Sequence, residues 1–225
     1  MRKIQRLVSV GAMAALTVAV GACSSSQGPA PAPASEPAAA SAAPETAVTA
    51  GGVTKISDIA GPACNQVPAD GPGSAQGMVD DRVATAASHN PLLSTLVAAV
   101  TAANLGDTLN SAEAVTVFAP INPAFDALPP DTVKDLTSAA NVAQPAGQLS
   151  KILTTHVVGA RYDAKGLQKA GTVDSLEGST LTIGGRAPTA LTVSSGGVTA
   201  KVICANIPTA NATVFLIDAV LKPAA

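Results

Sequence analysis

The sequence has very few aromatic residues. It contains no Trp, one Tyr and three Phe, although 47% of its 225 residues are hydrophobic. Sites for carbohydrate or single-stranded nucleic acid usually stack their ligands on exposed aromatic rings. The composition therefore disfavours both kinds of site, and it predicts a core built from Val, Leu, Ile and Ala.

Basic residues are also scarce. The chain has 13 Lys and Arg against 15 Asp and Glu. Arg2, Lys3 and Arg6 fall in an N-terminal segment that we expect to be removed, so the mature chain is more acidic still. Binding to nucleic acid requires many Lys and Arg contacts with phosphates. We therefore expect no nucleic-acid partner.

The usual signatures of catalysis are missing. The sequence has no HExxH, GxSxG or P-loop motif, and only two histidines. His89 stands next to a predicted helix start and is expected to be exposed. His156 lies on the apolar stripe of a predicted helix and Asp218 inside an apolar run, so we expect both to be hydrogen-bonded structural residues. We predict no catalytic residue, cofactor or metal site.

The N-terminus has the pattern of a secretion signal. The basic residues Arg2, Lys3 and Arg6 are followed by an apolar run over residues 7–20. This run is short for a membrane-spanning helix and is rich in small residues. The tetrad Val20-Gly-Ala-Cys23 resembles a bacterial lipobox, in which the cysteine accepts a diacylglyceryl group and becomes the mature N-terminus. Ordinary cleavage after Ala22, which leaves a free cysteine, is the alternative.

We accordingly predict a lipoprotein signal peptide at residues 1–22 and acylation of Cys23. Two or three acyl chains together hold a protein stably on a bilayer. The expected location is the outer, extracytoplasmic face of the cell membrane. Release of a fraction of the protein from the membrane is a second possibility.

The two remaining cysteines, Cys64 and Cys204, are an even number in an exported chain, which predicts a disulfide. Neither has CxxC spacing or neighbouring histidines, which disfavours metal binding and redox catalysis by the pair.

Residues 23–52 consist mostly of Ala, Pro, Ser, Gly and Thr. Such a segment buries too little apolar surface to offset its ordering entropy, so we predict a disordered tether. Thr46 and Thr49 are candidate sites for O-linked sugars, and a bare spacer is the equal alternative.

Residues 53–225 are predicted to form one α+β domain, with helices early and strands late. Helices are expected over residues 90–100 and 148–156, where apolar residues recur at helical spacing. Short strands are expected over residues 114–119, 173–176, 180–183, 190–193, 198–203 and 213–217, with turns at Gly184-Gly185 and at Gly196-Gly197. That order favours a late antiparallel sheet.

Three segments in register resemble the fasciclin (FAS1) domain over roughly residues 53–223. They are residues 116–130 (TVFAPINPAFDALPP), 152–158 (ILTTHVV) and 213–221 (TVFLIDAVL). Within the first, Asn122 is expected to cap a short helix that starts at Pro123. The lipobox, the tether and the cysteine pair add a resemblance to the mycobacterial fasciclin-domain surface lipoprotein antigens and their secreted relative.

The resemblance implies a wedge-shaped antiparallel β-sandwich with helices packed along one edge, and a role in adhesion. In many fasciclin domains a tyrosine precedes the motif histidine and the pair is linked to adhesion, whereas here Thr155 stands in its place. His156, Leu153 and Val157 match the motif. The resemblance thus assigns these residues, with Asn122 and Asp218, a structural or adhesive role.

Two functions follow as hypotheses. The first is a non-catalytic, immunogenic, lipid-anchored surface protein, monomeric, that contacts host receptors or matrix proteins. The second is an envelope carrier for a lipid or another small apolar ligand, because a domain rich in aliphatic side chains can hold an acyl chain by area alone. An enzyme or a purely structural envelope component is less favoured.

Overall fold

A computed structural model of the protein describes residues 54–128 and 147–224. The predicted signal peptide, the tether with Cys23, Thr46 and Thr49, and the segment after Leu128 lie outside the described residues. The helices, in chain order, are η1 (Ile56–Asp58), η2 (Cys64–Gln66), α1 (Ala75–Met78), α2 (Val83–His89), η3 (Pro91–Leu93), α3 (Ser94–Ala102), α4 (Gly106–Ser111), α5 (Asn122–Asp126), α8 (Gln148–Thr155) and α9 (Ala164–Ala170).

Seven strands form one sheet in the order β2-β1-β7-β6-β5-β4-β3. They are β1 (Val115–Pro120), β2 (Val157–Val158), β3 (Thr172–Asp174), β4 (Thr180–Arg186), β5 (Ala190–Ser195), β6 (Val198–Pro208) and β7 (Ala212–Ile217). The α+β composition expected from the sequence is confirmed. One pair departs from the expected antiparallel sheet, because β1 and β7 run parallel, with Phe118 opposite Phe215.

The sheet nearly closes on itself. β6 has register shifts between Val202 and Ile207, where it passes from one half of the sheet to the other. At the far end, Val158 of the edge strand β2 forms a bridge with Ser175, just after the opposite edge strand β3. Closure of this kind removes exposed strand edges, and it gives the sheet an inner and an outer face.

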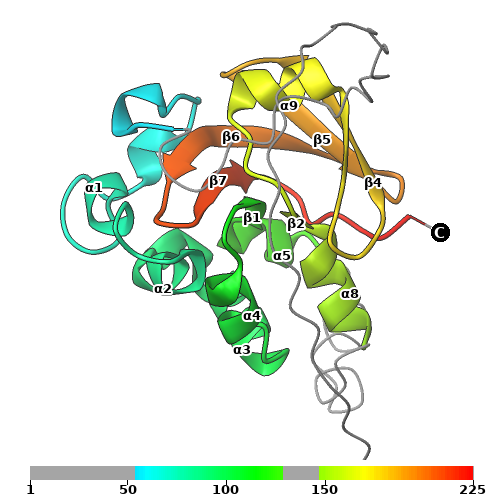
Figure 1. The fold of residues 1–225 in the computed structure, drawn as a ribbon, viewed down its shortest axis with the longest axis horizontal. Helices are drawn as coiled ribbons and strands as arrows, with labels where there is room; N and C mark the ends of the chain where they lie inside the picture. The colour runs from blue at the N-terminus through cyan, green and yellow to red at the C-terminus, as the bar shows by residue number, and fades with distance from the viewer. Residues whose placement is uncertain (1–53, 129–146, 225) are drawn as a thin grey trace, which may run out of the picture. The chain divides into compact units, whose positions relative to one another are not determined.

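Two cores pack on the two faces of the sheet, and the side chains of β1 and β7 alternate between them. Phe118 and Phe215 point into the inner core, which α9 covers, with ring centroids 5.6 Å apart. Val117 and Leu216 point into the outer core, beneath the helices. Figure 1 shows α2, α3, α4 and α8 on one side of the sheet and α9 on the other. Both strands are buried on both faces, so their sequences are apolar except for the buried Thr116 and Thr213.

The two predicted helices form where the periodicity placed them. Leu96 of α3 and Leu149, Ile152 and Leu153 of α8 are buried in the outer core. No single helix among the described residues is both long and apolar enough to cross a membrane, and α2 together with the following helical segment reaches the required length only with a bend of 104°.

The two predicted glycine turns had different outcomes. Gly196 and Gly197 form the β5–β6 turn, both with positive φ, which glycine adopts at little cost. The prediction for Gly184-Gly185 was wrong, since β4 continues through both to Arg186. A Cβ atom on Gly185 would lie 2.0 Å from the carbonyl oxygen of Ala190, so the close approach of β5 requires glycine there.

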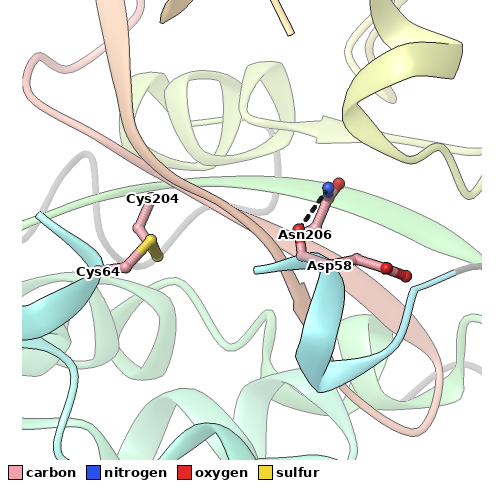
Figure 2. Close-up of a disulfide and its surroundings, with 4 residues drawn as sticks. All are labelled: Asp58, Cys64, Cys204 and Asn206. Carbon is pink, nitrogen blue, oxygen red and sulfur yellow. Dashed lines mark hydrogen bonds between the residues drawn. A yellow bond between two sulfur atoms is a disulfide. The ribbon is translucent and has the colours of Figure 1, made fainter. Parts of the chain in front are cut away.

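The N-terminal part of the described chain is fastened to β6 by two side chains. Cys64 is bonded to Cys204, with Cα atoms 4.9 Å apart. Asn206, two residues further along β6, donates from its side-chain amide to the carbonyl of Asp58. Figure 2 shows both links side by side along the same strand. The segment before α1 is therefore attached to the sheet by a covalent bond as well as by packing.

Breaking the disulfide should lower the stability of the domain. The bond closes a loop spanning 140 residues of sequence separation. In the chain-entropy model its loss costs up to about 5 kcal/mol. Urea unfolding of a Cys64→Ser, Cys204→Ser variant should show a lower midpoint and a steeper slope, because the unfolded chain without the cross-link exposes more surface. Reduced wild-type protein is the matched control and should unfold with the variant; an unchanged midpoint in both would contradict the prediction.

Candidate functional site

A cavity of about 300 Å³ lies on the helical side of the sheet. Its floor is formed by Val117 of β1 with Val214 and Leu216 of β7, its walls by α2, α3 and α4 and by Leu153 near the end of α8. The deeper lining is mostly apolar, with Asn90, His156 and Thr209 as its buried polar residues, and the cavity is partly open to solvent. A concave, mostly apolar space with a few polar groups at its edge is the usual form of a small-molecule site.

The motif histidine lies in the wall of this cavity and is completely buried. His156 follows the last residue of α8, and its Nδ1 is 2.7 Å from the carbonyl oxygen of Ile152. The backbone N–H of Leu221 donates to Nε2 at 3.0 Å. Because a carbonyl only accepts and an N–H only donates, the two partners fix a neutral imidazole that is protonated on Nδ1.

Burial lowers the pKa of His156 to about 4, and the hydrogen bond to Ile152 opposes this shift only in part. The imidazole therefore stays uncharged at neutral pH. It joins α8 to the C-terminal segment, while its own carbonyl accepts a hydrogen bond from Phe118 of β1 at 2.9 Å. This geometry gives His156 a structural role.

The other residues of the motif are buried as well. Leu153 is 5% and Val157 3% exposed, and Thr155, at the position of the family tyrosine, is fully buried and donates to the carbonyl of Lys151. None of these side chains can reach a macromolecular partner without local unfolding. Any adhesive contact has to use other surfaces.

Asn122 does not cap its own helix, contrary to the sequence prediction. Its side-chain oxygen accepts from the N–H of Thr95 at 3.0 Å, and its amide donates to the carbonyl of Pro91 at 2.9 Å. Ile121 occupies the N-cap position of α5, without a side-chain cap. Asn122 therefore connects α5 to the start of α3, so it sets the position of one wall of the cavity relative to the sheet.

Asp218 accepts a hydrogen bond from the N–H of Lys201 at 2.7 Å, which is the backbone contact that we expected. Its burial was predicted wrongly, because the side chain is exposed. The chain leaves β7 after Ile217, and Asp218 faces outward at that bend. The carboxylate thus ties β7 to β6 at the surface and does not need a buried counter-charge.

Arg161 is a buried cation that was not predicted from the sequence. Its guanidinium donates to the carbonyls of Thr209 and Ala210 and to the hydroxyl of Thr213. Burial lowers its pKa. The side chain therefore holds the β6–β7 connection through carbonyl acceptors, and no pattern in the local sequence signals that arrangement.

Within residues 54–128 and 147–224 no group of three or more His, Cys, Asp or Glu side chains could hold a metal ion. His89 is exposed and is paired with Asp81, 3.2 Å away, on the outer side of α2, so the two histidines do not meet. The lining of the cavity is mostly apolar, so the cavity is suited to binding an apolar group.

The family model of the fasciclin domain matches residues 91–223. The chain belongs to the fasciclin family. The fasciclin-domain match begins at η3, yet Met78, Val83 and Ala86, which precede it, pack in the same outer core.

Several relatives of this fasciclin-domain chain are mycobacterial proteins. The chain aligns with the cell surface glycolipoprotein MPB83 of Mycobacterium bovis over 226 alignment positions with 40% identity. The alignment covers 96% of each chain. The chain is 42% identical over 176 residues to the immunogenic protein MPB70 of the same species, covering 75% of this chain and 84% of that one. A solved FAS1 domain pair from the insect cell adhesion molecule fasciclin I aligns with a TM-score of 0.45 and 24% identity, over 58% of this chain and 45% of that one.

The buried histidine should make the fasciclin domain less stable as the pH falls from 7 to 4. The unfolded chain binds a proton on His156 near pH 6.5, whereas the folded chain binds it near pH 4. Only the unfolded state gains this proton in that window, so the free energy of unfolding should fall by on the order of 3 kcal/mol. Urea unfolding at several pH values measures the loss, and NMR titration of the His156 ring gives the folded pKa.

A His89→Gln variant is the control for this titration, because it removes the exposed histidine and leaves the buried one. It should keep most of the pH dependence. A folded-state pKa for His156 close to 6.5 would show that the ring is not held as the two hydrogen bonds require.

Proposed function

We propose that the protein is a lipid-anchored, outward-facing fasciclin module that makes non-catalytic contacts with other macromolecules at the cell surface. The observation that carries this proposal is the alignment with a cell surface glycolipoprotein over 96% of both chains, which extends through the region of Cys23 and the tether. In this proposal Cys23 bears the acyl groups, and the chain from there to the domain is a spacer. Thr46 and Thr49 are proposed sugar sites on that spacer.

The partners in this proposal are host receptors or matrix proteins, and the protein acts as a monomer. The surface that meets them excludes the histidine motif, because Leu153, His156 and Val157 are buried. The motif instead supports the module from inside. The similarity to the immunogenic protein MPB70 supports exposure of the module to a host.

The full chain carrying Cys23→Ser, which cannot be acylated at that position, should bind matrix proteins or host-cell surfaces saturably at micromolar concentration. Surface plasmon resonance and flow cytometry measure this binding. Leu153→Ile keeps the buried volume nearly constant, and Val157→Ile adds one methylene beside the cavity, so both variants should bind as the parent does. The absence of saturable binding to every surface tested would overturn the adhesive role. Loss of binding in a motif variant of unchanged stability would show that the motif itself is the contact.

A second function, carriage of a small apolar ligand in the envelope, is favoured by the cavity between the helices and the sheet. The space has a mostly apolar lining and lies within the size range of small-molecule sites. A surface module could use it alongside macromolecular contacts, since the two use different parts of the molecule.

Native mass spectrometry of protein isolated from its own envelope should detect a co-purifying apolar molecule if the second function holds. Acyl groups on Cys23 are covalently bound and stay on the protein when it unfolds, whereas a carried ligand dissociates. The mass of the unfolded protein therefore distinguishes a carried ligand from the acyl groups. Protein recovered repeatedly without any dissociable ligand would count against carriage.

A further inference from the structure

The cavity has a deep apolar part and a polar edge, and the two parts come from different residues. Leu93, Leu96 and Val117 are among its buried lining residues. The exposed lining residues are Thr85, Ser88, Thr101, Asp107, Thr108 and Leu176. A ligand that fits this arrangement has an apolar tail and a head that can accept or donate hydrogen bonds at the edge.

Volume sets the size of the tail. An apolar protein cavity of about 150 Å³ holds one benzene molecule, so 300 Å³ corresponds to roughly a dozen carbon atoms on the same scale. The elements that line the space converge on one cavity, which favours a single chain over a branched or two-chain lipid. Each added methylene that becomes buried should raise the affinity about fourfold until the space is full.

The chemistry of the edge sets the head group. Four of the six exposed lining residues carry a hydroxyl group, and Asp107 is the one charged residue among all the lining residues that the structure describes. No Lys or Arg is among them. A carboxylate or phosphate head group would therefore have no cation to pair with in the lining, and the Asp107 carboxylate would repel it. An uncharged head group avoids both penalties.

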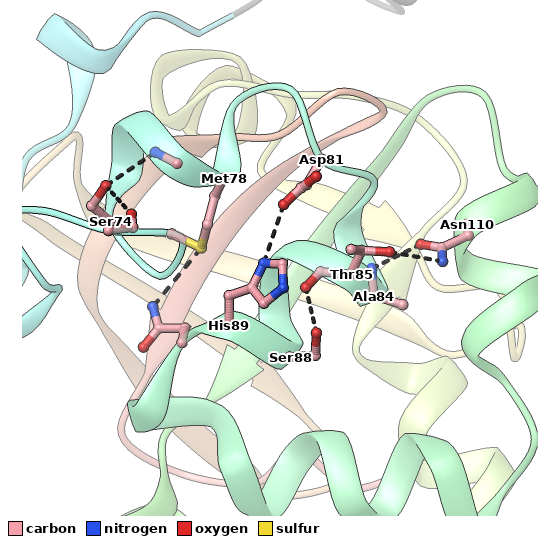
Figure 3. A network of polar contacts seen from close by, with 11 residues as sticks. Ser74, Met78, Asp81, Ala84, Thr85, Ser88, His89 and Asn110 are labelled. Carbon is pink, nitrogen blue, oxygen red and sulfur yellow. Dashed lines mark hydrogen bonds and ion pairs between the residues drawn. The ribbon is translucent and has the colours of Figure 1, made fainter.

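Several polar groups on and beside α2 are already hydrogen-bonded, among them the hydroxyls of Thr85 and Ser88 in the lining. Figure 3 shows the His89 ring paired with Asp81, and Asn110 linked to Ala84 and Thr85. Arg82, just before α2, donates to the carbonyl of Asn110. These contacts hold α2 against α4, and they give the Arg82 and His89 side chains partners within the protein.

Leu176 marks the apolar part of the edge. Its side chain is 50% exposed, the largest exposed fraction among the big hydrophobic residues that the structure describes. Its backbone N–H donates to Val157 at 2.7 Å, and a Cβ atom on Gly159 would lie 3.1 Å from its Cδ2 atom. The backbone is thus fixed at β2 while the side chain is free to cover the end of a bound tail.

From this geometry we propose that the cavity binds one uncharged, single-chain amphiphile, such as a monoacylglycerol, with its tail over β1 and β7 and its head at the hydroxyl-bearing edge. The inference rests on the second proposed function and gives it a ligand class. It excludes free fatty acids and anionic phospholipids as preferred ligands.

The test uses the full chain carrying Cys23→Ser and two probes with the same twelve-carbon tail, monododecanoylglycerol and dodecanoate, each below its micelle concentration. Isothermal titration calorimetry at neutral pH should show at least about tenfold tighter binding of the neutral probe. Asp107→Asn should tighten the binding of dodecanoate and leave the neutral probe unchanged. Asp126→Asn, an exposed residue outside the lining, is the matched control and should change neither.

Filling the cavity tests the location. Val97→Phe places a ring in the lining and should weaken the neutral probe at least tenfold, whereas Ala98→Phe adds the same ring to an exposed position of α3 outside the lining and should have no effect. Ala87→Leu is a second filling variant, used if Val97→Phe lowers the unfolding midpoint. Equal binding of both probes, still sensitive to cavity filling, would overturn the choice of head group and leave carriage intact. No saturable binding, or binding insensitive to both filling variants, would overturn the site and the carrier function together.

Discussion

The neutral imidazole and the backbone of His156 link three segments of the chain that are far apart in the sequence. His156 accepts from Leu221 and donates to Ile152, and its carbonyl accepts from Phe118. Helix α8, the central strand β1 and the segment after β7 therefore meet at one residue. Both hydrogen bonds of the His156 ring require a neutral imidazole. Burial lowers the pKa of His156, so it also keeps the ring in the form that makes these hydrogen bonds. A charged ring could not accept the bond from Leu221.

The scarcity of aromatic residues explains where the cavity lies. Phe118 and Phe215 both go to the inner core, where they stack opposite each other across β1 and β7. The outer core receives only the partly buried Phe125 among the phenylalanines. Helix α2 buries Val83 and Ala86, and α3 buries Leu96, so few large side chains from these helices fill the space above the sheet. We attribute the cavity to this unequal distribution of large side chains between two cores of one sheet.

The sequence predicted what depends on local periodicity and missed what depends on distant partners. Helix α8 and the late strands have strong apolar patterns and form as expected. Helix α2, with the sequence VATAASH, has too little contrast between its faces to be recognised. The parallel pairing of β1 with β7 joins segments almost a hundred residues apart, and the partners of Asn122 lie 27 and 31 residues before it. A cavity is a lack of atoms, so no motif in the sequence marks it.

The cavity and the disulfide both lie in the outer core. Their contributions to the free energy of unfolding are opposite in sign and similar in size. An empty apolar cavity of 300 Å³ costs about 7 kcal/mol at ~24 cal/mol per Å³, an upper value because this one is partly open. Closing the loop between Cys64 and Cys204 contributes up to about 5 kcal/mol in the opposite direction. Cys204 is itself a residue of the outer core, and Cys64 packs against it. A disulfide persists only in an oxidising compartment, so a fasciclin domain with this cavity is best suited to the outside of the cell, where the bond that offsets the cavity is stable.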